Sequence, residues 1–314
     1  MLTYEQQKMR ATGIGASEIA AIAGIPGAYG HPLEVWGAKM HHLDATIPPP
    51  PALGAWYVDL GNVLEEPLAH AWAAKTGLSY APSPGTLRHP SIPYVLATPD
   101  RMVGDDGVLE IKKRRSADGW GEDGDAIAPA VLAQVQWQLA VCERTVGHVA
   151  VLIGGVELRT YVVAADPAYQ ADLLAIAAEW WTRHIVGRTP PPIDGTDAAR
   201  RFLAARYPLD TAGPVLDPDV TRRAEPLAEA YARASAAEKA AAAAKQGAAN
   251  ALRELLGEHA QVEGAWGRVS CKAQRAAAPW RELALGAGVT EAEGRARAPT
   301  HRVLRVSVKG GVES

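Results

Sequence analysis

The segment ATPDRMVGDDGVLEIKK contains two carboxylates and one amine at a spacing that allows them to meet. Asp100 lies on the first of two expected strands, and Glu110 and Lys112 lie on the second, after the turn Gly-Asp-Asp-Gly. Because side chains alternate along a strand, Glu110 and Lys112 share one face, and the turn brings them back toward Asp100. The spacing therefore predicts that the three side chains converge.

These groups suit a divalent cation and a phosphate ester. Paired carboxylates favour hard cations with oxygen ligands, Mg²⁺ first and Mn²⁺ as a substitute. The Lys112 amine can hold an attacking water or offset charge on a phosphoryl oxygen. A bound cation lowers the pKa of the water and stabilises the pentacovalent phosphate. The residues therefore indicate phosphodiester hydrolysis, and the alternative is an ordinary surface ion cluster beside a hairpin.

The elements around this hairpin predict an α/β (α+β) fold. Leu109 and Ile111 alternate with Glu110, as expected for a strand that is buried on one side. The order helix, helix, strand pair, helix, strand pair, helix predicts a central mixed sheet flanked by helices. The expected helices cover residues 16–23, 60–75, 130–142 and 167–185, and the expected strands cover 95–103, 108–112, 149–153 and 158–163.

The composition changes after Pro190-Pro191-Pro192, which predicts a domain boundary. We expect a domain at 1–190, a linker at 191–218, an alanine-rich helical segment at 219–260, and a small β-hairpin with a basic tail at 261–314. The tail is either a DNA-contacting arm or a solubilising end. Its basic residues are Arg295, Arg297, Arg302, Arg305 and Lys309.

The bulk composition restricts the class of protein. The 314 residues carry a net charge of −3, so a DNA-binding surface has to be local. A local basic cluster, Lys113-Arg114-Arg115, directly follows the lysine of the hairpin. The two cysteines form no CxxC pair, which argues against a disulfide framework or a structural zinc site. The sequence shows no signal peptide and no membrane span, so we expect a cytoplasmic protein.

Several catalytic motifs are missing from the sequence. GxxxxGK[ST] is absent, so the chain carries no nucleotide-driven motor of its own. HExxH and GxSxG are absent too, so neither a zinc protease nor a serine hydrolase is supported.

Five ordered motifs resemble those of a known nuclease family. The segments TPD and LEIK look like the PD-(D/E)xK nuclease signature, and the wider pattern resembles the YqaJ-like viral recombinase (phage lambda exonuclease) family. The further matching segments are Arg10-Ala-Thr-Gly-Ile-Gly-Ala-Ser17, Gly61-Asn-Val-Leu-Glu65, Thr98, and Gln134-Val-Gln136. The resemblance covers about residues 8–188 and implies a restriction-endonuclease-like core.

The resemblance also implies roles for these residues. Arg10 and Ser17 would grip the 5′-terminal or scissile phosphate, and Thr98 would help to bind phosphate. Glu65 would lie beside the metal, although the adjacent Glu66 remains an alternative. Gln134 would border the active site. We further expect Asp100, Glu110 and the main-chain carbonyl of Ile111 to be the metal ligands.

The expected function is therefore a Mg²⁺-dependent exonuclease that degrades linear double-stranded DNA, 5′→3′, in phage-type recombination. The resemblance implies that the chain could form a trimer and act with a single-strand annealing protein. Three alternatives stay open: a restriction or repair endonuclease with the same core, an inactive DNA-binding or assembly protein, and a ligand-binding α/β protein with incidental charges.

Overall fold

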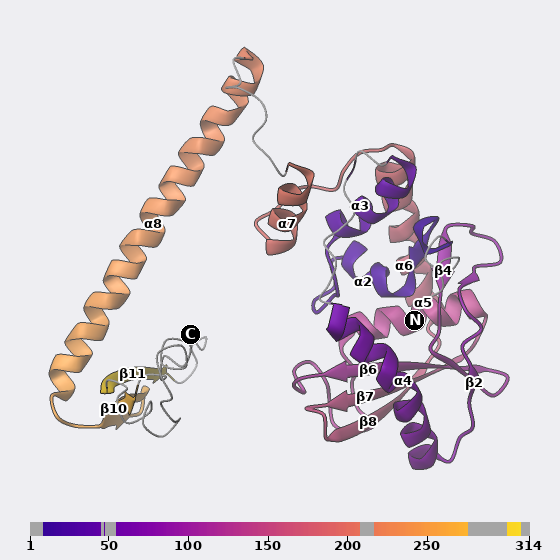
Figure 1. The fold of residues 1–314 in the computed structure, drawn as a ribbon, viewed down its shortest axis with the longest axis horizontal. Coiled ribbons are helices and arrows are strands. Elements are labelled where there is room, and N and C mark those ends of the chain that lie inside the picture. The colour runs from indigo at the N-terminus through magenta and orange to yellow at the C-terminus, as the bar shows by residue number, and fades with distance from the viewer. Residues whose placement is uncertain (1–8, 45–46, 48–54, 208–216, 276–299, 309–314) are drawn as a thin grey trace, which may run out of the picture. The chain divides into compact units, whose positions relative to one another are not determined.

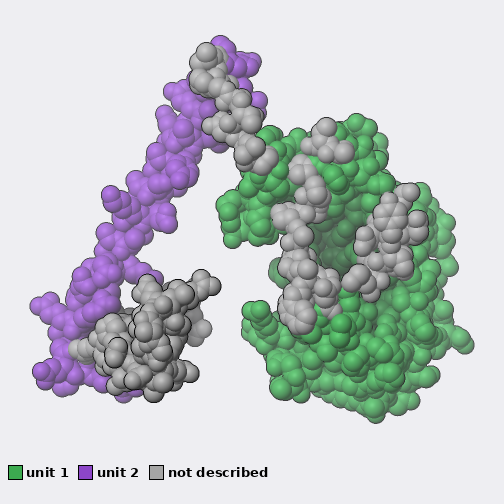
Figure 2. All heavy atoms as spheres, viewed as in Figure 1, with its two compact units in different colours: residues 1–211 green, residues 212–314 purple. Residues whose placement is uncertain are grey.

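The structure is a computed structural model, and it describes residues 9–44, 47, 55–207, 217–275 and 300–308 (Figure 1). The chain divides into two compact units, residues 1–211 and 212–314 (Figure 2). The candidate residues that the sequence singles out all belong to the first unit, so the two units are described separately.

A five-stranded mixed sheet lies at the centre of the first unit. Its order is β2-β5-β6-β7-β8, and β6 and β7 run parallel while the other neighbours are antiparallel. Helices flank the sheet, so the unit has the predicted α/β architecture (Figure 1). The strands are β2 (Ala81–Pro82), β5 (Arg101–Val103), β6 (Gly107–Arg114), β7 (Val146–Ile153) and β8 (Glu157–Ala164).

Helices cover both faces of strand β6. On one face α4 (Ala55–Thr76) packs Leu68 and Trp72 against Leu109 and Ile111. On the other face α5 (Pro129–Cys142) packs Val131 and Val135 against Val108 and Val149. The expectation that this strand is buried on one side only was therefore wrong, because α5 closes the second face and encloses Glu110 as well.

Helix α5 approaches the sheet closely at one glycine. A Cβ atom at Gly147 of β7 would lie 2.2 Å from Cγ1 of Val135. Only a residue without a side chain fits there, so this glycine sets the spacing between helix and sheet.

The expected strand over residues 95–103 is divided between two sheets. β4 (Val95–Ala97) lies in a small sheet of order β1-β4-β3, with β1 (Ile14–Gly15) and β3 (Leu87–Arg88), whereas β5 belongs to the central sheet. Pro99 lies at the break, and proline has no N–H to donate to a ladder. Asp100 therefore lies in the connection between β4 and β5. The expectation that it lies on a strand was wrong.

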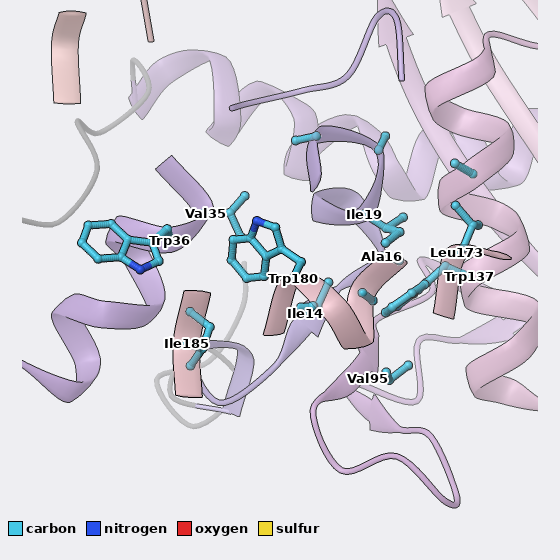
Figure 3. Close-up of a cluster of buried hydrophobic side chains, with 14 of the residues drawn as sticks. Ile14, Ala16, Ile19, Val35, Trp36, Val95, Trp137, Leu173, Trp180 and Ile185 are labelled. Atoms are coloured by element: carbon cyan, nitrogen blue, oxygen red, sulfur yellow. The ribbon is translucent and has the colours of Figure 1, made fainter. Parts of the chain in front are cut away.

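A helical layer packs on the small sheet around an apolar core (Figure 3). The expected helix over 167–185 begins as α6 and continues as a π-helix. Helix α3 was not anticipated, because its apolar positions are interrupted by His41, His42 and Lys39. The elements of this layer are α2 (Ala16–Ile22), α3 (Pro32–Leu43), α6 (Pro167–Trp180) and the π-helix η1 (Trp181–Val186).

The segment that we expected to be a linker, residues 191–218, contains helix α7 (Asp197–Arg206). Phe202 is buried and makes an edge contact with Trp36 of α3, at a centroid distance of 5.9 Å. Burial of this aromatic side chain explains why the first unit extends to residue 211 instead of ending at 190.

The described residues of the second unit form a long helix and three strands. Helix α8 (Pro218–Leu256) packs Leu256 against Val269 and Cys271 of the sheet β9-β10-β11. The strands are β9 (Gln261–Gly264), β10 (Gly267–Arg275) and β11 (Thr300–Val308). Among the basic tail residues, Arg295, Arg297 and Lys309 lie outside the described residues, and the side chains of Arg302 and Arg305 are not described either. Within the described ranges, no helix is long and apolar enough to cross a membrane.

Candidate active site

The end of β6 and the connection before β5 bring together the Asp, Glu and Lys side chains of the hairpin. Asp100 Oδ2 accepts a hydrogen bond from the Ile111 N–H at 2.7 Å, which fixes the aspartate against β6. Lys112 Nζ donates a hydrogen bond to Glu110 Oε1. Asp100 and Glu110 also line one cavity. The three side chains are thus neighbours, in the arrangement that their spacing predicts.

Helix α5 holds Glu110 by both of its oxygens. Gln134 Nε2 donates to Oε1 at 2.7 Å, and Gln138 Nε2 donates to Oε2 at 2.6 Å. The Glu110 side chain is only 3% exposed, so these donors replace water around a buried carboxylate. Gln138 was not among our candidate site residues, although its position four residues after Gln134 puts both on one helix face. Gln136 points elsewhere, and its Oε1 accepts the Asp166 N–H at 2.9 Å.

Burial and the neighbouring Glu110 destabilise the ionised form of Asp100. Burial raises the pKa of Asp100 well above its usual range, the negative charge of Glu110 adds to that increase, and Lys112 opposes it. A cation held between the carboxylates would offset this repulsion, so the electrostatics of the site fit a metal ion.

The donor set also fits Mg²⁺. The N–H and C=O groups of one residue in a strand point to the same side, so the Ile111 carbonyl lies on the edge where its N–H meets Asp100. Within the described residues, no group of three His, Cys, Asp or Glu side chains is arranged for metal binding. A set of two carboxylates and one carbonyl would leave further positions, which Mg²⁺ commonly fills with water and substrate oxygens.

The structure distinguishes the two adjacent glutamates of α4. Burial raises the pKa of Glu65, and its charge interacts with those of Glu110 and Lys112. Glu66 accepts hydrogen bonds from Arg101 Nη2 at 2.5 Å and from the Tyr80 hydroxyl at 2.9 Å, and these bonds lower its pKa. Glu65 also lies 3.9 Å from Arg101 Nη1, so it stays the candidate for the site on its electrostatic interaction with Glu110 and Lys112. Glu66 is hydrogen-bonded in a surface network.

A polar cavity of about 130 Å³ joins Asp100 and Glu110 to the N-terminal motif. Arg10 Nη2 donates to Ser17 Oγ at 3.0 Å. The Thr98 hydroxyl lies 2.9 Å from that of Thr86. The cavity is lined by Arg10, Gly15, Ala16, Ser17, Leu96, Thr98, Asp100, Glu110 and Gln134. One cavity thus joins three of the carboxylate-site residues to all three residues expected to bind phosphate.

The pairing of β1 with β4 explains this proximity. Ile14 pairs with Val95, and the Ile14 N–H donates to the Tyr94 carbonyl at 2.6 Å. A Cβ atom at Gly13 would lie 2.5 Å from that carbonyl oxygen, so only glycine allows the close approach. The strand pair therefore carries Arg10 and Ser17 to the segment that ends in Thr98.

A family model for the YqaJ-like viral recombinase domain matches residues 5–145. Over these residues the chain is similar to that domain. The matched range contains every residue that we expected in the site, from Arg10 to Gln134. β7, β8, α6, η1, α7 and the whole second unit follow the matched range.

The chain is also similar to a curated protein and to several solved structures. It is 28% identical over 201 residues to the uncharacterized protein YqaJ of Bacillus subtilis (strain 168), and the match spans 63% of this chain and 61% of that protein.

Among the solved structures, it is similar to an alkaline exonuclease (LHK-Exo) from Laribacter hongkongensis, with a TM-score of 0.46 and 18% identity over 59% of this chain and 94% of that one. A phage related exonuclease from Haemophilus somnus 129PT has a TM-score of 0.42 and 12% identity, over 56% of this chain and 96% of that one.

Proposed function

We propose that this protein is a Mg²⁺-dependent deoxyribonuclease that degrades linear double-stranded DNA from its ends, 5′→3′, in phage-type homologous recombination. The observation that carries the proposal is the single cavity that joins Asp100 and Glu110 to Arg10, Ser17 and Thr98. A carboxylate pair with an adjacent amine suits phosphodiester hydrolysis, and a neighbouring cationic and hydroxyl-lined wall suits the phosphate.

The metal would be held by Asp100, Glu110 and the carbonyl of Ile111, with Glu65 in support. When bound, Mg²⁺ supplies a water of lowered pKa and stabilises negative charge on the phosphate, and Mn²⁺ can replace it. Gln134 and Gln138 keep both oxygens of Glu110 in place through the hydrogen bonds of α5.

Lys112 is the group proposed to act on the attacking water. Its side chain is 19% exposed and its Nζ donates to Glu110, so the amine lies at the boundary between the buried carboxylate and solvent. From there it can orient the water and offset charge that develops on a phosphoryl oxygen.

Arg10, Ser17 and Thr98 would bind the phosphate that is cleaved or that ends the 5′ strand. A guanidinium presents several donors in a fixed plane, and a phosphate accepts them with charge-assisted hydrogen bonds. The cluster Lys113-Arg114-Arg115 lies where β6 leaves the site and would contact the DNA backbone.

The proposal also includes 5′→3′ cleavage, a trimeric state and a single-strand annealing partner. These three parts rest on the resemblance to the family. We propose that the protein acts in the cytoplasm of a bacterial or phage-infected cell, where DNA ends are available.

Digestion of end-labelled linear duplex DNA tests the proposal directly. With Mg²⁺ we expect steady release of mononucleotides from the 5′ ends, and with EDTA we expect none. Closed circular DNA should remain intact under the same conditions. Nicking of the circle would favour a restriction or repair endonuclease, and binding without any cleavage would favour an inactive DNA-binding protein.

A further inference from the structure

A charged side chain outside the reacting groups is buried behind the phosphate-binding segment. Lys39 of α3 is 2% exposed, and its Nζ lies 2.8 Å from both carboxylate oxygens of Glu18. The same Nζ donates to the main-chain carbonyl of Arg10 at 2.8 Å. A buried ammonium is costly unless it is paired and hydrogen-bonded, so this position requires a reason.

This ion pair holds both ends of the turn that precedes Ser17. Lys39 binds the carbonyl of Arg10 at one end. At the other end, Glu18 Oε2 accepts the Gly15 N–H at 2.7 Å. The main chain between these points is thus fixed by two side chains that do not line the cavity.

This turn sets the direction of the phosphate-binding groups. The Arg10 guanidinium returns to the Ser17 hydroxyl at 3.0 Å, and both groups line the cavity beside Asp100. A shift of the Arg10 main chain would move its guanidinium away from this position. Misplacement of a binding group by about 1 Å can reduce the rate of an enzyme about 100-fold.

Helix α3 offers a rigid base for the lysine. Val35, Trp36 and Met40 of this helix are buried in the same apolar core as Ile14 and Ala16. Figure 3 shows Val35 and Trp36 beside Trp180 and Ile185, at the end of α6 and in the π-helix. The amine is therefore attached to a well-packed element, although an apolar side chain would pack in this core at a lower desolvation cost.

We propose that Lys39, together with Glu18, is a positioning residue that fixes Arg10 and Ser17 for recognition of a DNA phosphate. The inference rests on the proposed nuclease function and deepens it. It assigns the preference for a 5′-phosphorylated end to an ion pair that does not itself touch the DNA.

The test compares Lys39→Met with Lys75→Met as a matched control. Lys75 also binds one carboxylate, Asp123 Oδ2 at 2.5 Å, and one carbonyl, Leu158 O at 2.8 Å, but it lies outside the cavity lining. The measurement is the ratio of kcat/KM for 5′-phosphorylated over 5′-hydroxyl duplex ends. We expect Lys39→Met to reduce this ratio about tenfold, mainly through KM, and Lys75→Met to leave it unchanged. A ratio that is the same in Lys39→Met and wild type would overturn the proposal, as would a wild type without any preference.

A double variant separates positioning from folding. Lys39→Met alone leaves the partly buried Glu18 without its counter-ion, so the single variant can lose stability for that reason. The variant Lys39→Met with Glu18→Gln removes both charges, and we expect its Tm to return toward that of wild type. Its phosphate preference should stay low, because the donor to the Arg10 carbonyl is still missing. A double variant with the wild-type preference would show that the pair is structural only.

Thermal stabilisation by inorganic phosphate provides a readout that does not depend on hydrolysis. We expect phosphate to raise the Tm of wild type and of Lys75→Met, and to raise that of Lys39→Met less. If wild type does not cleave DNA, the nuclease proposal fails, while this measurement still decides whether Lys39 supports an anion site. Equal shifts in all three proteins would refute the role of Lys39.

Discussion

The two units of the chain use charged residues in opposite ways. In the first unit, Lys39 and Glu110 are buried, and each makes several specific hydrogen bonds. In the described part of the second unit, the pair Arg233 and Glu229 is 71% and 63% exposed, and Leu256, Val269 and Cys271 form the small core. Exposed pairs contribute little to stability, whereas buried charges are retained at a cost. This contrast supports our proposal that the chemistry takes place in the first unit.

The largest expected effect is the loss of hydrolysis in Lys112→Ala. Removing the amine should reduce kcat at least about 100-fold, because the variant can no longer orient the water or offset phosphoryl charge. DNA binding, measured by fluorescence anisotropy in Ca²⁺, should stay within a few-fold of wild type. Lys75→Ala is the matched control, since its amine binds Asp123 and the Leu158 carbonyl and does not line the cavity. Equal rates in Lys112→Ala and wild type would refute the catalytic assignment.

The next effect separates the adjacent glutamates of α4. Glu65→Gln should weaken Mg²⁺ binding and reduce activity about 10–100-fold, as is usual for groups that support a metal site. Glu66→Gln should change activity by less than about threefold, because Glu66 is bound to Arg101 and Tyr80 at the surface. Activity as a function of Mg²⁺ concentration gives both results, and the reverse order would reassign the site to Glu66.

A smaller effect is expected for Arg10→Ala. The variant should lose about tenfold in kcat/KM on 5′-phosphorylated ends and little on hydroxyl ends, because one charge-assisted contact is removed. Competition between the two substrates in one reaction measures the preference directly. An unchanged preference would exclude Arg10 from phosphate recognition.

A change in stability is expected at Asp100. Since its pKa in the folded protein is raised above that of the unfolded chain, its ionised form opposes folding at neutral and alkaline pH, and the penalty disappears as pH falls through the raised value. Asp100→Asn should therefore raise the Tm in EDTA at pH 8 by about 2–4 °C, and the gain should shrink on acidification. The amide oxygen can still accept the Ile111 N–H. A lower Tm at pH 8 would contradict the proposed repulsion.

The smallest effect belongs to the second unit. Arg233→Gln should change the free energy of unfolding by less than about 0.5 kcal/mol and leave DNA hydrolysis unchanged, because its partner Glu229 is an exposed residue one helical turn away. Chemical denaturation and the duplex assay measure these quantities. A marked loss of activity would show that α8 takes part in DNA binding and would break the contrast between the units.

Local patterns in the sequence predicted much of the fold. Strict alternation and a Gly-Asp-Asp-Gly turn predicted that Glu110 and Lys112 share a face near Asp100, and apolar spacing predicted α5 with Gln134. The strand assigned to Asp100 was wrong because Pro99 interrupts the ladder. The contacts of Lys39 were not predictable from the sequence, because they join residues 29 and 21 positions apart, and only the packing of α3 against α2 brings them together.

Gly147 shows how a residue without chemistry of its own can limit a catalytic centre. The distance between α5 and the sheet is set where the helix rests on this glycine, and that same distance determines whether the two glutamine amides reach the carboxylate of Glu110. A single methyl group at the contact would lift the helix and lengthen both hydrogen bonds at once. A substitution at Gly147 is thus expected to disturb the carboxylate site as well as the local packing.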